Sequence, residues 1–370
     1  MKYSLRLNLS MATLTETAYF SRQGLKYTLI ALVALLFLKI IIGEIGPLRQ
    51  RLFPPPPPQP NVFFGPLPPI KFPEGKTPSE PITYTADFIG GVLPESSSSA
   101  RVYFMPQPAL SLLTLDRANE LAQNLGFKSQ PEPLSPTLYR WVDSEQPFRT
   151  LKREISTGNF TLNYDFFRDP SVLTEKELPY GKEAISEVMR FLERYNLRTA
   201  NLREDEGKVT FWKLVGTDFV PVASVSEAEI TRVDLFHTPM DNLSLVTPSY
   251  KWAPVYFLLS GSSGKKRILS FQYIFRIVEQ GIFATYPLKT TQEAWADLED
   301  GKGYVANMGE VKGTHATIRR VFLAYYDSEV YESYLQPVFV FEGDEGFTAY
   351  VPAVVKAWVA QPTGDSQKPS

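Results

Sequence analysis

The sequence contains no cysteine and only two histidines among its 370 residues. The absence of cysteine excludes disulfide bonds, zinc sites built from thiolates and cysteine nucleophiles. The histidines, His237 and His315, lie in separate segments without the H-E-x-x-H spacing of a metalloenzyme helix. We therefore expect both to be surface residues, and we predict no metal site.

Sequence motifs for nucleotide binding and hydrolysis are also missing. The segment SGSSGKK at residues 260–266 lacks the spacing of a phosphate-binding loop and lies between two predicted strands, which indicates a hairpin turn. No G-x-S-x-G elbow occurs, and the acidic runs do not follow the order of a calcium loop. We predict no catalytic residue, no cofactor and no enzymatic activity. A hydrolase built from dispersed carboxylates is left open as a third hypothesis.

Neither sign of charge dominates. The chain has 38 lysines and arginines against 40 aspartates and glutamates, a net charge of -2 and a pI of about 5.9. This balance gives no reason to expect a nucleic acid as partner. Hydrophobic residues make up 44% of the chain and aromatic residues 13%, so most of it is expected to fold.

A long apolar run near the N-terminus predicts a membrane anchor. Eleven leucines, isoleucines, valines and phenylalanines lie between residues 29 and 42. They favour insertion by about 3 to 7 kcal/mol in total, whereas the charge of Lys39 opposes it by about 3 kcal/mol at most. The predicted transmembrane helix covers residues 27–46, with Leu29, Leu32, Leu36 and Lys39 as anchor residues.

The residues around this run predict its orientation. Four basic residues precede it and two follow it, which places residues 1–26 in the cytoplasm and the C-terminal domain outside the cell membrane. No small-x-small cleavage site follows the run, so an uncleaved single-pass anchor is favoured over a signal peptide.

A proline-rich segment follows. Residues 54–81 hold twelve prolines, which predicts an extended polyproline II stalk over residues 47–81. A ligand for an SH3-like or WW-like groove is the alternative. The segment is too apolar for a plain spacer, and we expect five side chains to lie along the following domain: Phe63, Phe64, Leu67, Ile70 and Phe72.

The rest of the chain alternates between helical and strand patterns. Apolar residues recur at helical spacing over residues 114–127, 179–197 and 290–301, and strand-like runs follow each helix. Residues 337–355 read as a hairpin with apolar residues on both faces. We predict an α+β fold of repeated helix-plus-antiparallel-meander units, with lobes at 82–168 and 169–358 and a disordered tail at 359–370.

Tyrosines cluster in the segment LAYYDSEVYESYLQP. Tyrosine combines apolar area with a hydroxyl group and is enriched at binding surfaces. We predict that a partner binds here, although burial between paired strands is the competing interpretation. The predicted partner-binding residues are Tyr325, Tyr326, Tyr331 and Tyr334.

Residues 292–355, with AWADLEDGKG, TIRRVFLAYY and YLQPVFVFEG, resemble the closing section of the YycI-type accessory proteins. The resemblance implies one N-terminal membrane anchor and an extracytoplasmic α+β domain related to YycH and PepSY-like modules. It also implies no enzymatic activity and regulation of a membrane sensor histidine kinase through protein contacts. The proline stalk, the helix-strand round before Asp169, and Phe339 in place of a tryptophan depart from that family.

We therefore predict a non-enzymatic regulatory or scaffolding protein that acts through protein-protein contacts, with a membrane protein such as a sensor kinase as partner. The alternative is an envelope module that binds cell-wall glycan or peptide. That alternative predicts a groove lined by Trp141, Trp212 and Trp252.

Overall fold

The computed structural model describes residues 26–28, 32, 35, 39, 59–73, 81–88, 90–199, 201–202, 207–311 and 314–361. The chain divides into two compact units, Met1–Pro57 and Pro58–Ser370, and each is considered by itself. In the first unit the described residues are helical and exposed.

The predicted transmembrane helix falls largely outside the described residues. Leu29 and Leu36 are not described, Leu32 is 59% exposed, and Lys39 is exposed. Within the described ranges, no helix is both long enough and apolar enough to cross a bilayer. This finding corrects the predicted single-pass topology, with its cytoplasmic tail and extracytoplasmic domain. That prediction used the summed free energy of transferring the side chains into a bilayer. This sum does not determine how many consecutive residues form a helix.

The second unit contains an antiparallel sheet of nine strands, here called the large sheet. Its strands lie in the order β3-β4-β5-β6-β12-β11-β9-β7-β8. Strands from both sides of the predicted lobe boundary at residues 168 and 169 share this sheet. The strands are β3 (Glu132–Pro133), β4 (Leu138–Val142), β5 (Arg149–Glu154), β6 (Phe160–Tyr164), β7 (Lys208–Val215), β8 (Asp218–Val222), β9 (Ile230–Leu235), β11 (Val255–Leu259) and β12 (Ile268–Tyr273).

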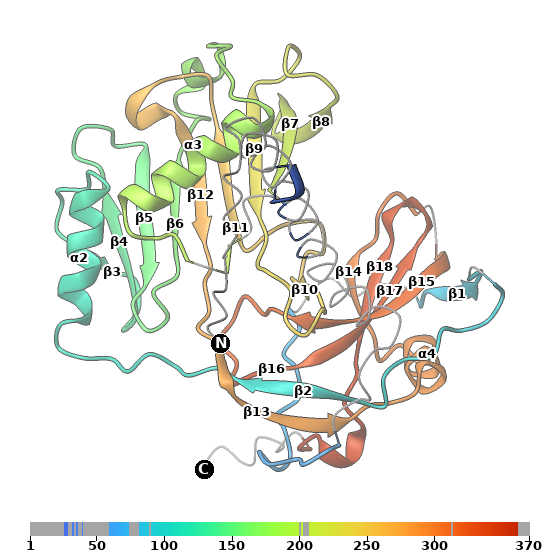
Figure 1. Ribbon diagram of the computed structural model, residues 1–370. Coiled ribbons are helices and arrows are strands. Elements are labelled where there is room, and N and C mark those ends of the chain that lie inside the picture. The colour runs from blue at the N-terminus through green and yellow to red at the C-terminus, as the bar shows by residue number, and fades with distance from the viewer. Residues whose placement is uncertain are drawn as a thin grey trace, which may run out of the picture. The chain divides into compact units, whose positions relative to one another are not determined.

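Helices α2 (Thr114–Asn124) and α3 (Gly181–Arg194) cover one face of the large sheet, and Figure 1 shows α3 running across its middle strands. The strands present alternate residues to this face: Val255, Phe257 and Leu259 of β11 are all buried in one core with Ala184 of α3. Alternation with period two therefore determines which side chains meet the helices.

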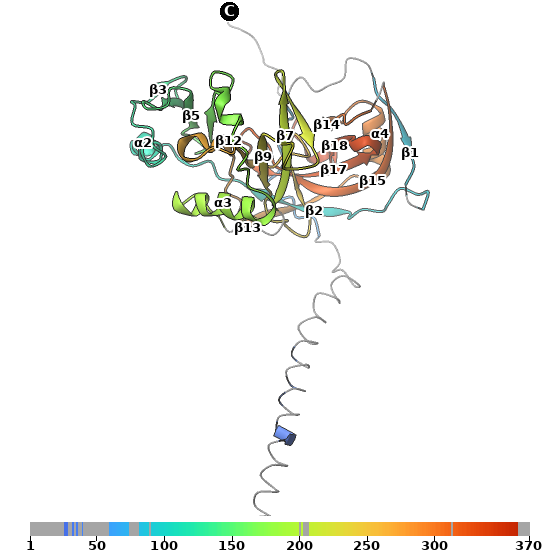
Figure 2. The same cartoon turned by 90° about the horizontal axis from the view of Figure 1, so that it is seen from above.

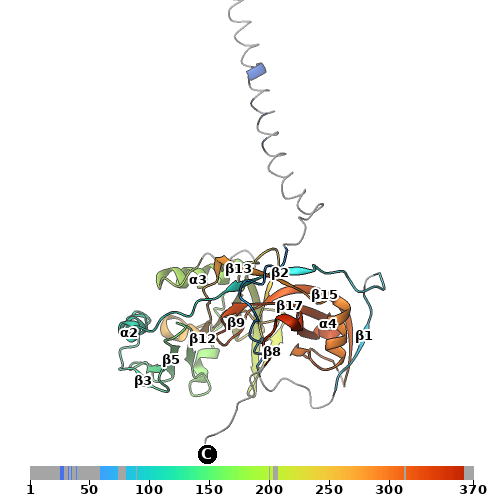
Figure 3. The ribbon, with the colours of Figure 1, turned by 90° about the horizontal axis from the view of Figure 1, so that it is seen from below.

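Two further sheets complete the unit. The C-terminal sheet runs β1-β15-β17-β18-β14, with β10 also paired to β15, and the small sheet runs β13-β2-β16. Figure 2 shows α4 (Thr291–Glu299) beside β14 and β18, and Figure 3 shows β1 at the outer edge. The strands are β1 (Thr83–Ala86), β2 (Ser99–Phe104), β10 (Leu245–Val246), β13 (Glu279–Pro287), β14 (Tyr304–Asn307), β15 (His315–Tyr326), β16 (Tyr334–Leu335), β17 (Pro337–Gly343) and β18 (Thr348–Pro352).

The predicted fold class is wrong, although the predicted helices and most strands are present. The described part of the second unit has far more strand than helix, arranged in large antiparallel sheets, and it does not repeat a helix followed by a meander. The reason is the long-range pairing of β6 with β12, which joins Asn163 to Ser270 across 107 residues of sequence. A local pattern of alternation does not reveal such a pairing.

The predicted two-sided hairpin is confirmed in β17 and β18. Phe339 and Phe341 lie in one apolar core with Leu298 of α4, whereas Val338 and Val340 lie in another core. Both faces of the hairpin are therefore covered, which accounts for apolar residues at successive positions.

Residues 59–73, here called the proline strap, belong to the second unit and pack against its sheets. Leu67 is fully buried, its main-chain N–H donates to the oxygen of Trp358 at 2.8 Å, and its own oxygen accepts from the N–H of Ala360 at 2.7 Å. The strap is therefore part of the folded core, and it also fixes residues at the start of the predicted C-terminal tail. The strap extends from Leu67 to residue 59 on one side and to residue 73 on the other.

Aromatic side chains hold the strap on either side of Leu67. Phe72 stacks on Tyr304 with ring centroids 4.8 Å apart and meets Tyr326 edge-on at 4.8 Å. Phe64 lies 4.9 Å from the ring of Tyr334. The prediction that apolar strap residues lie along the domain is confirmed for Phe64, Leu67, Ile70 and Phe72, whereas Phe63 is 79% exposed.

Truncation of Leu67 tests the contribution of the strap to stability. We expect Leu67→Ala to lower the free energy of unfolding by about 2–5 kcal/mol, because it leaves a cavity in the core. Leu112→Ala is the matched control, since Leu112 is 99% exposed and loses little contact. Denaturant unfolding of both variants gives the comparison, and equal destabilisation would contradict a core role for the strap.

Candidate functional site

The four tyrosines predicted to bind a partner do not share one exposed surface. Tyr325 is fully buried and Tyr326 is 3% exposed, while Tyr331 and Tyr334 are half-buried. The rings of Tyr326 and Tyr334 contact the proline strap. The structure therefore places these side chains mainly in contacts within the chain.

Their hydroxyl groups also meet internal partners. The hydroxyl of Tyr325 lies 3.0 Å from a carboxylate oxygen of Asp241 and 3.0 Å from the main-chain oxygen of Arg101. The hydroxyl of Tyr331 donates to the main-chain oxygen of Met105 at 2.8 Å. These bonds join β15 and the loop after it to β2 and to the loop before β10.

A cleft of about 600 Å³ lies elsewhere, on the helix-covered face of the large sheet. It is bounded by α3, by the C-terminal end of α2 and by the turn between β11 and β12. The pocket is of the size that binds a ligand or a few side chains of a partner. Its lining residues are Asn124, Leu125, Gly126, Arg149, Glu187, Val188, Arg190, Phe191, Arg194, Tyr195, Phe257, Leu259, Gly264, Lys265, Arg267 and Ile268.

The ends of the two helices shape this cleft. The N–H of Phe127 bonds to the oxygen of Ala122 at 2.8 Å, and the N–H of Gly126 bonds to that of Gln123 at 2.9 Å. Gly126 has a φ of 92°, which completes a Schellman motif. Helix α3 ends in the same way, with Asn196 at a φ of 54°. The chain therefore turns sharply after each of the two helices, next to the cleft, and leaves the cleft open.

The floor of the cleft is apolar and rigid. The ring of Phe191, half-buried on α3, meets Phe257 and Phe271 edge-on with centroids 5.5 Å away in each case. Phe257 and Phe271 are themselves stacked at 4.0 Å. A half-buried aromatic ring that is fixed from below offers contact area at a low entropic cost, as anchor positions of interfaces do.

The rim of the cleft is basic. Arg190 and Arg194 are four residues apart on α3, both exposed, and neither makes an ion pair within the described ranges. Arg267 differs, because its Nε and Nη2 atoms each donate to a carboxylate oxygen of Glu187 at 2.7 Å. The two arginines of α3 therefore carry the charge that is free to meet a ligand.

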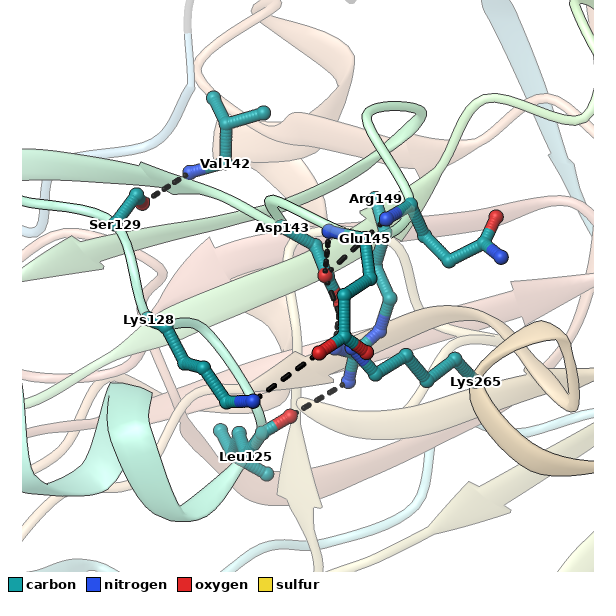
Figure 4. Close-up of polar contacts among 9 residues, drawn as sticks. Leu125, Lys128, Ser129, Val142, Asp143, Glu145, Arg149 and Lys265 are labelled. Carbon is teal, nitrogen blue, oxygen red and sulfur yellow. Dashed lines mark hydrogen bonds and ion pairs between the residues drawn. The ribbon is translucent and has the colours of Figure 1, made fainter.

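A buried ion cluster closes the other end of the cleft (Figure 4). The fully buried carboxylate of Asp143 accepts from Arg149 Nη1 at 3.0 Å and from Lys265 Nζ at 3.0 Å. Glu145 lies 2.8 Å from Lys265 and 3.1 Å from Lys128. The cluster thereby ties β5 to the turn before β12.

The pKa of Asp143 reflects these contacts. Burial alone would raise it, but hydrogen bonds from Lys265, from the main-chain N–H of Glu145 and from Arg149 together hold the pKa of Asp143 below its usual value. Arg149 also donates to the main-chain oxygen of Leu125 at 3.0 Å, where a cation is favourable at the C-terminus of α2. The carboxylate of Asp143 is therefore ionised at neutral pH.

The charges in and next to the cleft do not balance. Five lining residues are basic, Arg149, Arg190, Arg194, Lys265 and Arg267, and one is acidic, Glu187. With the neighbouring charges of Lys128, Asp143, Glu145, Glu177 and Glu183 included, six basic side chains stand against five acidic ones, so the excess of positive charge belongs to the lining itself. The site thus combines an apolar floor with a basic rim.

The histidines take different positions. His315 is exposed, as expected, but the side chain of His237 is 7% exposed and its Nδ1 lies 3.1 Å from a carboxylate oxygen of Asp327. The expectation of a surface residue is wrong for His237. In the described part of the chain, no group of three or more histidine, cysteine, aspartate or glutamate residues is placed to hold a metal ion.

Sequence reasoning missed the cleft. Its basic residues come from α3, from Arg149 of β5, and from Lys265 and Arg267 in and just after the segment SGSSGKK, which was interpreted only as a hairpin turn. The one visible signal was on α3, where Arg190 and Arg194 flank Phe191. Residues four apart share a helix face, so this spacing places two charges along the same edge.

Neutralising Asp143 tests the ion cluster. We expect Asp143→Asn to lower the free energy of unfolding by about 3–5 kcal/mol near pH 7, because Arg149 stays buried without its carboxylate partner. Glu132→Gln is the control: Glu132 forms an exposed pair with Arg140, and the expected loss is about 1 kcal/mol or less. Denaturant unfolding at neutral pH measures both.

The pH dependence has a definite sign. Because the pKa of Asp143 is lowered in the folded state, its contribution is fully present above the unfolded pKa of about 4 and is lost as the pH falls through the folded value. The difference between the native chain and Asp143→Asn should therefore shrink in acid. A constant difference from about pH 7 to about pH 3 would contradict the assigned shift.

Comparison with known proteins gives no family. No protein-family model matches the chain, and no curated protein matches it. An uncharacterized protein from Eubacterium rectale ATCC 33656 is similar in structure, with a TM-score of 0.37 and 10% identity, over 71% of this chain and 85% of that one. YycH from Bacillus subtilis is similar with a TM-score of 0.32 and 13% identity, over 71% of this chain and 54% of YycH. The chain thus spans about half the length of YycH.

Proposed function

We propose that this protein is a non-enzymatic regulatory or scaffolding protein, and that the cleft between α2 and α3 binds an acidic, amphipathic segment of a protein partner. The observation that carries the proposal is the combination of an apolar floor at the half-buried ring of Phe191, which rests on the buried ring of Phe257, with two rim arginines that form no ion pair among the described residues.

Each half of this combination selects a property of the ligand. The half-buried ring of Phe191 favours a ligand that brings apolar side chains, since their burial against this ring is favourable. Arg190 and Arg194 favour carboxylates, which accept charge-assisted hydrogen bonds from a guanidinium group. A helix with apolar residues on one face and acidic residues beside them fits both requirements.

A nucleic acid fits less well. Binding to phosphates requires many basic side chains along a path, and three of the five basic residues that line this cleft are paired with carboxylates, in a chain with a net charge of -2. Phe191 also lies inside a cleft, where its ring is edge-on to the neighbouring rings of the floor. It therefore does not form an open surface on which a base could stack. A protein segment is therefore the favoured occupant.

Among protein partners, a sensor histidine kinase comes first. The kinase is the partner implied by the resemblance of residues 292–355 to the YycI-type proteins. A cleft that captures one segment of such a partner would bias its conformation only through a difference in affinity between two states.

A defined peptide tests the proposal. The probe is a synthetic amphipathic helix with leucines on one face and glutamates beside them, and its counterpart carries lysines in place of the glutamates. We expect the acidic peptide to bind the full chain at least about tenfold more tightly than the basic one, a difference of about 1.4 kcal/mol. Raising the salt concentration should weaken the acidic complex, because the rim charges are exposed. Fluorescence anisotropy measures the affinities.

Variants of α3 separate the two contributions. Phe191→Ala should weaken both peptides, since it removes the apolar anchor. Arg190→Gln combined with Arg194→Gln should remove the preference for the acidic peptide, whereas Lys182→Gln should leave it unchanged, because Lys182 is an exposed residue of α3 that does not line the cleft. Equal binding of both peptides by the native chain would overturn the proposal.

A further inference from the structure

Two of the three tryptophans predicted to line a groove meet on the other face of the large sheet. Trp212 of β7 and Trp252, in the loop between β10 and β11, have ring centroids 5.5 Å apart and planes inclined by 51°. Both rings are half-buried and line a pocket of about 440 Å³. Trp141 lies elsewhere, 1% exposed, with its Nε1 donating to Asn119 at 3.1 Å.

Trp252 is held from behind by a stack of planar groups. The guanidinium of Arg232 lies 4.0 Å from the ring of Trp252 and 4.1 Å from that of Tyr256. The buried carboxylate of Asp234 accepts from Arg232 Nε at 2.7 Å and from Nη2 at 2.8 Å. The guanidinium cannot turn without breaking this pair, so the indole is fixed in its plane.

The loop around Trp252 is tied to the same carboxylate. The N–H of Ala253 donates to Asp234 at 3.0 Å, and the hydroxyl of Thr247 donates to the main-chain oxygen of Trp252 at 2.7 Å. An aromatic side chain that is fixed before its ligand arrives gives up little conformational entropy on binding. Packing in a core does not require a half-exposed ring to be fixed in this way.

Polar groups surround the two indoles. The pocket also includes Lys208, Thr210, Asn307 and Glu310, which supply donors and acceptors of both kinds. A second pocket of about 160 Å³, to which Gln272 contributes, shares Trp252 and Ser249 with the first. Trp252 lines both pockets and thus stands between two adjacent sites.

We propose that this pair of pockets binds a saccharide, with one pyranose ring on the wedge of Trp212 and Trp252 and a neighbouring ring beside Gln272. A pyranose presents C–H groups on its faces, which pack on an indole, and hydroxyl groups around its edge, which pair with amide, hydroxyl and charged groups. This site is separate from the cleft that binds the protein partner, and the proposal does not rest on it.

Other ligands meet an obstacle in the same pocket. A quaternary ammonium ion also binds aromatic rings, but Lys208 and Lys251 line this pocket and repel a cation. Glu310 lines the pocket together with these two lysines, so an anion is attracted by one part of the lining and repelled by another. A neutral ligand with many hydroxyl groups avoids both conflicts.

Titration of the full chain with three trisaccharides, triacetylchitotriose, cellotriose and maltotriose, tests the proposal by calorimetry and saturation-transfer NMR. We expect at least one of them to bind with a dissociation constant below about 1 mM. Trp252→Ala should weaken this binding about tenfold or more, and Trp358→Phe, at a half-buried tryptophan outside both pockets, should leave it unchanged.

A second variant guards against a loss of folding in Trp252→Ala. Lys208 and Glu310 are exposed, so Lys208→Gln combined with Glu310→Gln should fold normally and weaken binding about threefold or more. The proposal is overturned if none of the trisaccharides binds at about 10 mM, or if binding is indifferent to both sets of variants. Preferential binding of tetramethylammonium at Trp252 would overturn it as well.

Discussion

The pairing of β6 with β12 is the contact on which the rest of the second unit depends. It brings β5, which carries Arg149, next to the turn that carries Lys265, and so creates both sides of the cleft. The pairing closes a long loop, which costs chain entropy. Burial offsets that cost: Phe160 of β6 lies 5.1 Å from the ring of Phe271 and 5.3 Å from that of Tyr273. Without this junction, each half of the large sheet would present a bare edge strand and an incomplete core.

Local patterns predicted the elements, but not their partners. Helical spacing correctly indicated α2, α3 and α4, since an apolar stripe and a stop at a residue such as Gly126 are properties of the segment itself. Strand alternation looks the same whether the neighbour is adjacent in sequence or 107 residues away, as for Asn163 and Ser270. The predicted meanders failed for that reason.

The candidate sites were predictable only in part, for a related reason. Residue type marked Tyr326 as a binding residue, and the structure shows that it does bind a proline-rich segment, but that of its own chain. Trp212 and Trp252 were predicted to line a groove together with Trp141. The first two do line one pocket, but nothing in the sequence indicated that Trp141 is absent from it. The basic rim of the cleft is visible on α3, but its remaining cations come from segments that only the tertiary fold brings together. Strand β11 contributes to both candidate sites: Phe257 faces the cleft, and Tyr256 faces Arg232 at the tryptophan pocket.

The proline strap has a mechanical consequence. Tension that reaches residue 59 along the chain first meets Gln59, whose main-chain oxygen accepts from Thr285 Oγ1 of β13 at 2.5 Å. Asn61 is next, and its N–H and side-chain oxygen bond to Thr285 at 3.1 and 2.9 Å. Leu67 follows, held by its buried side chain and by main-chain bonds to Trp358 and Ala360. The load is thus shared among several attachments to β13 and to the C-terminal segment before it reaches β1 at the edge of the C-terminal sheet. A force applied at the N-terminal end of the strap therefore acts on these attachments before it acts on the strands of the sheet.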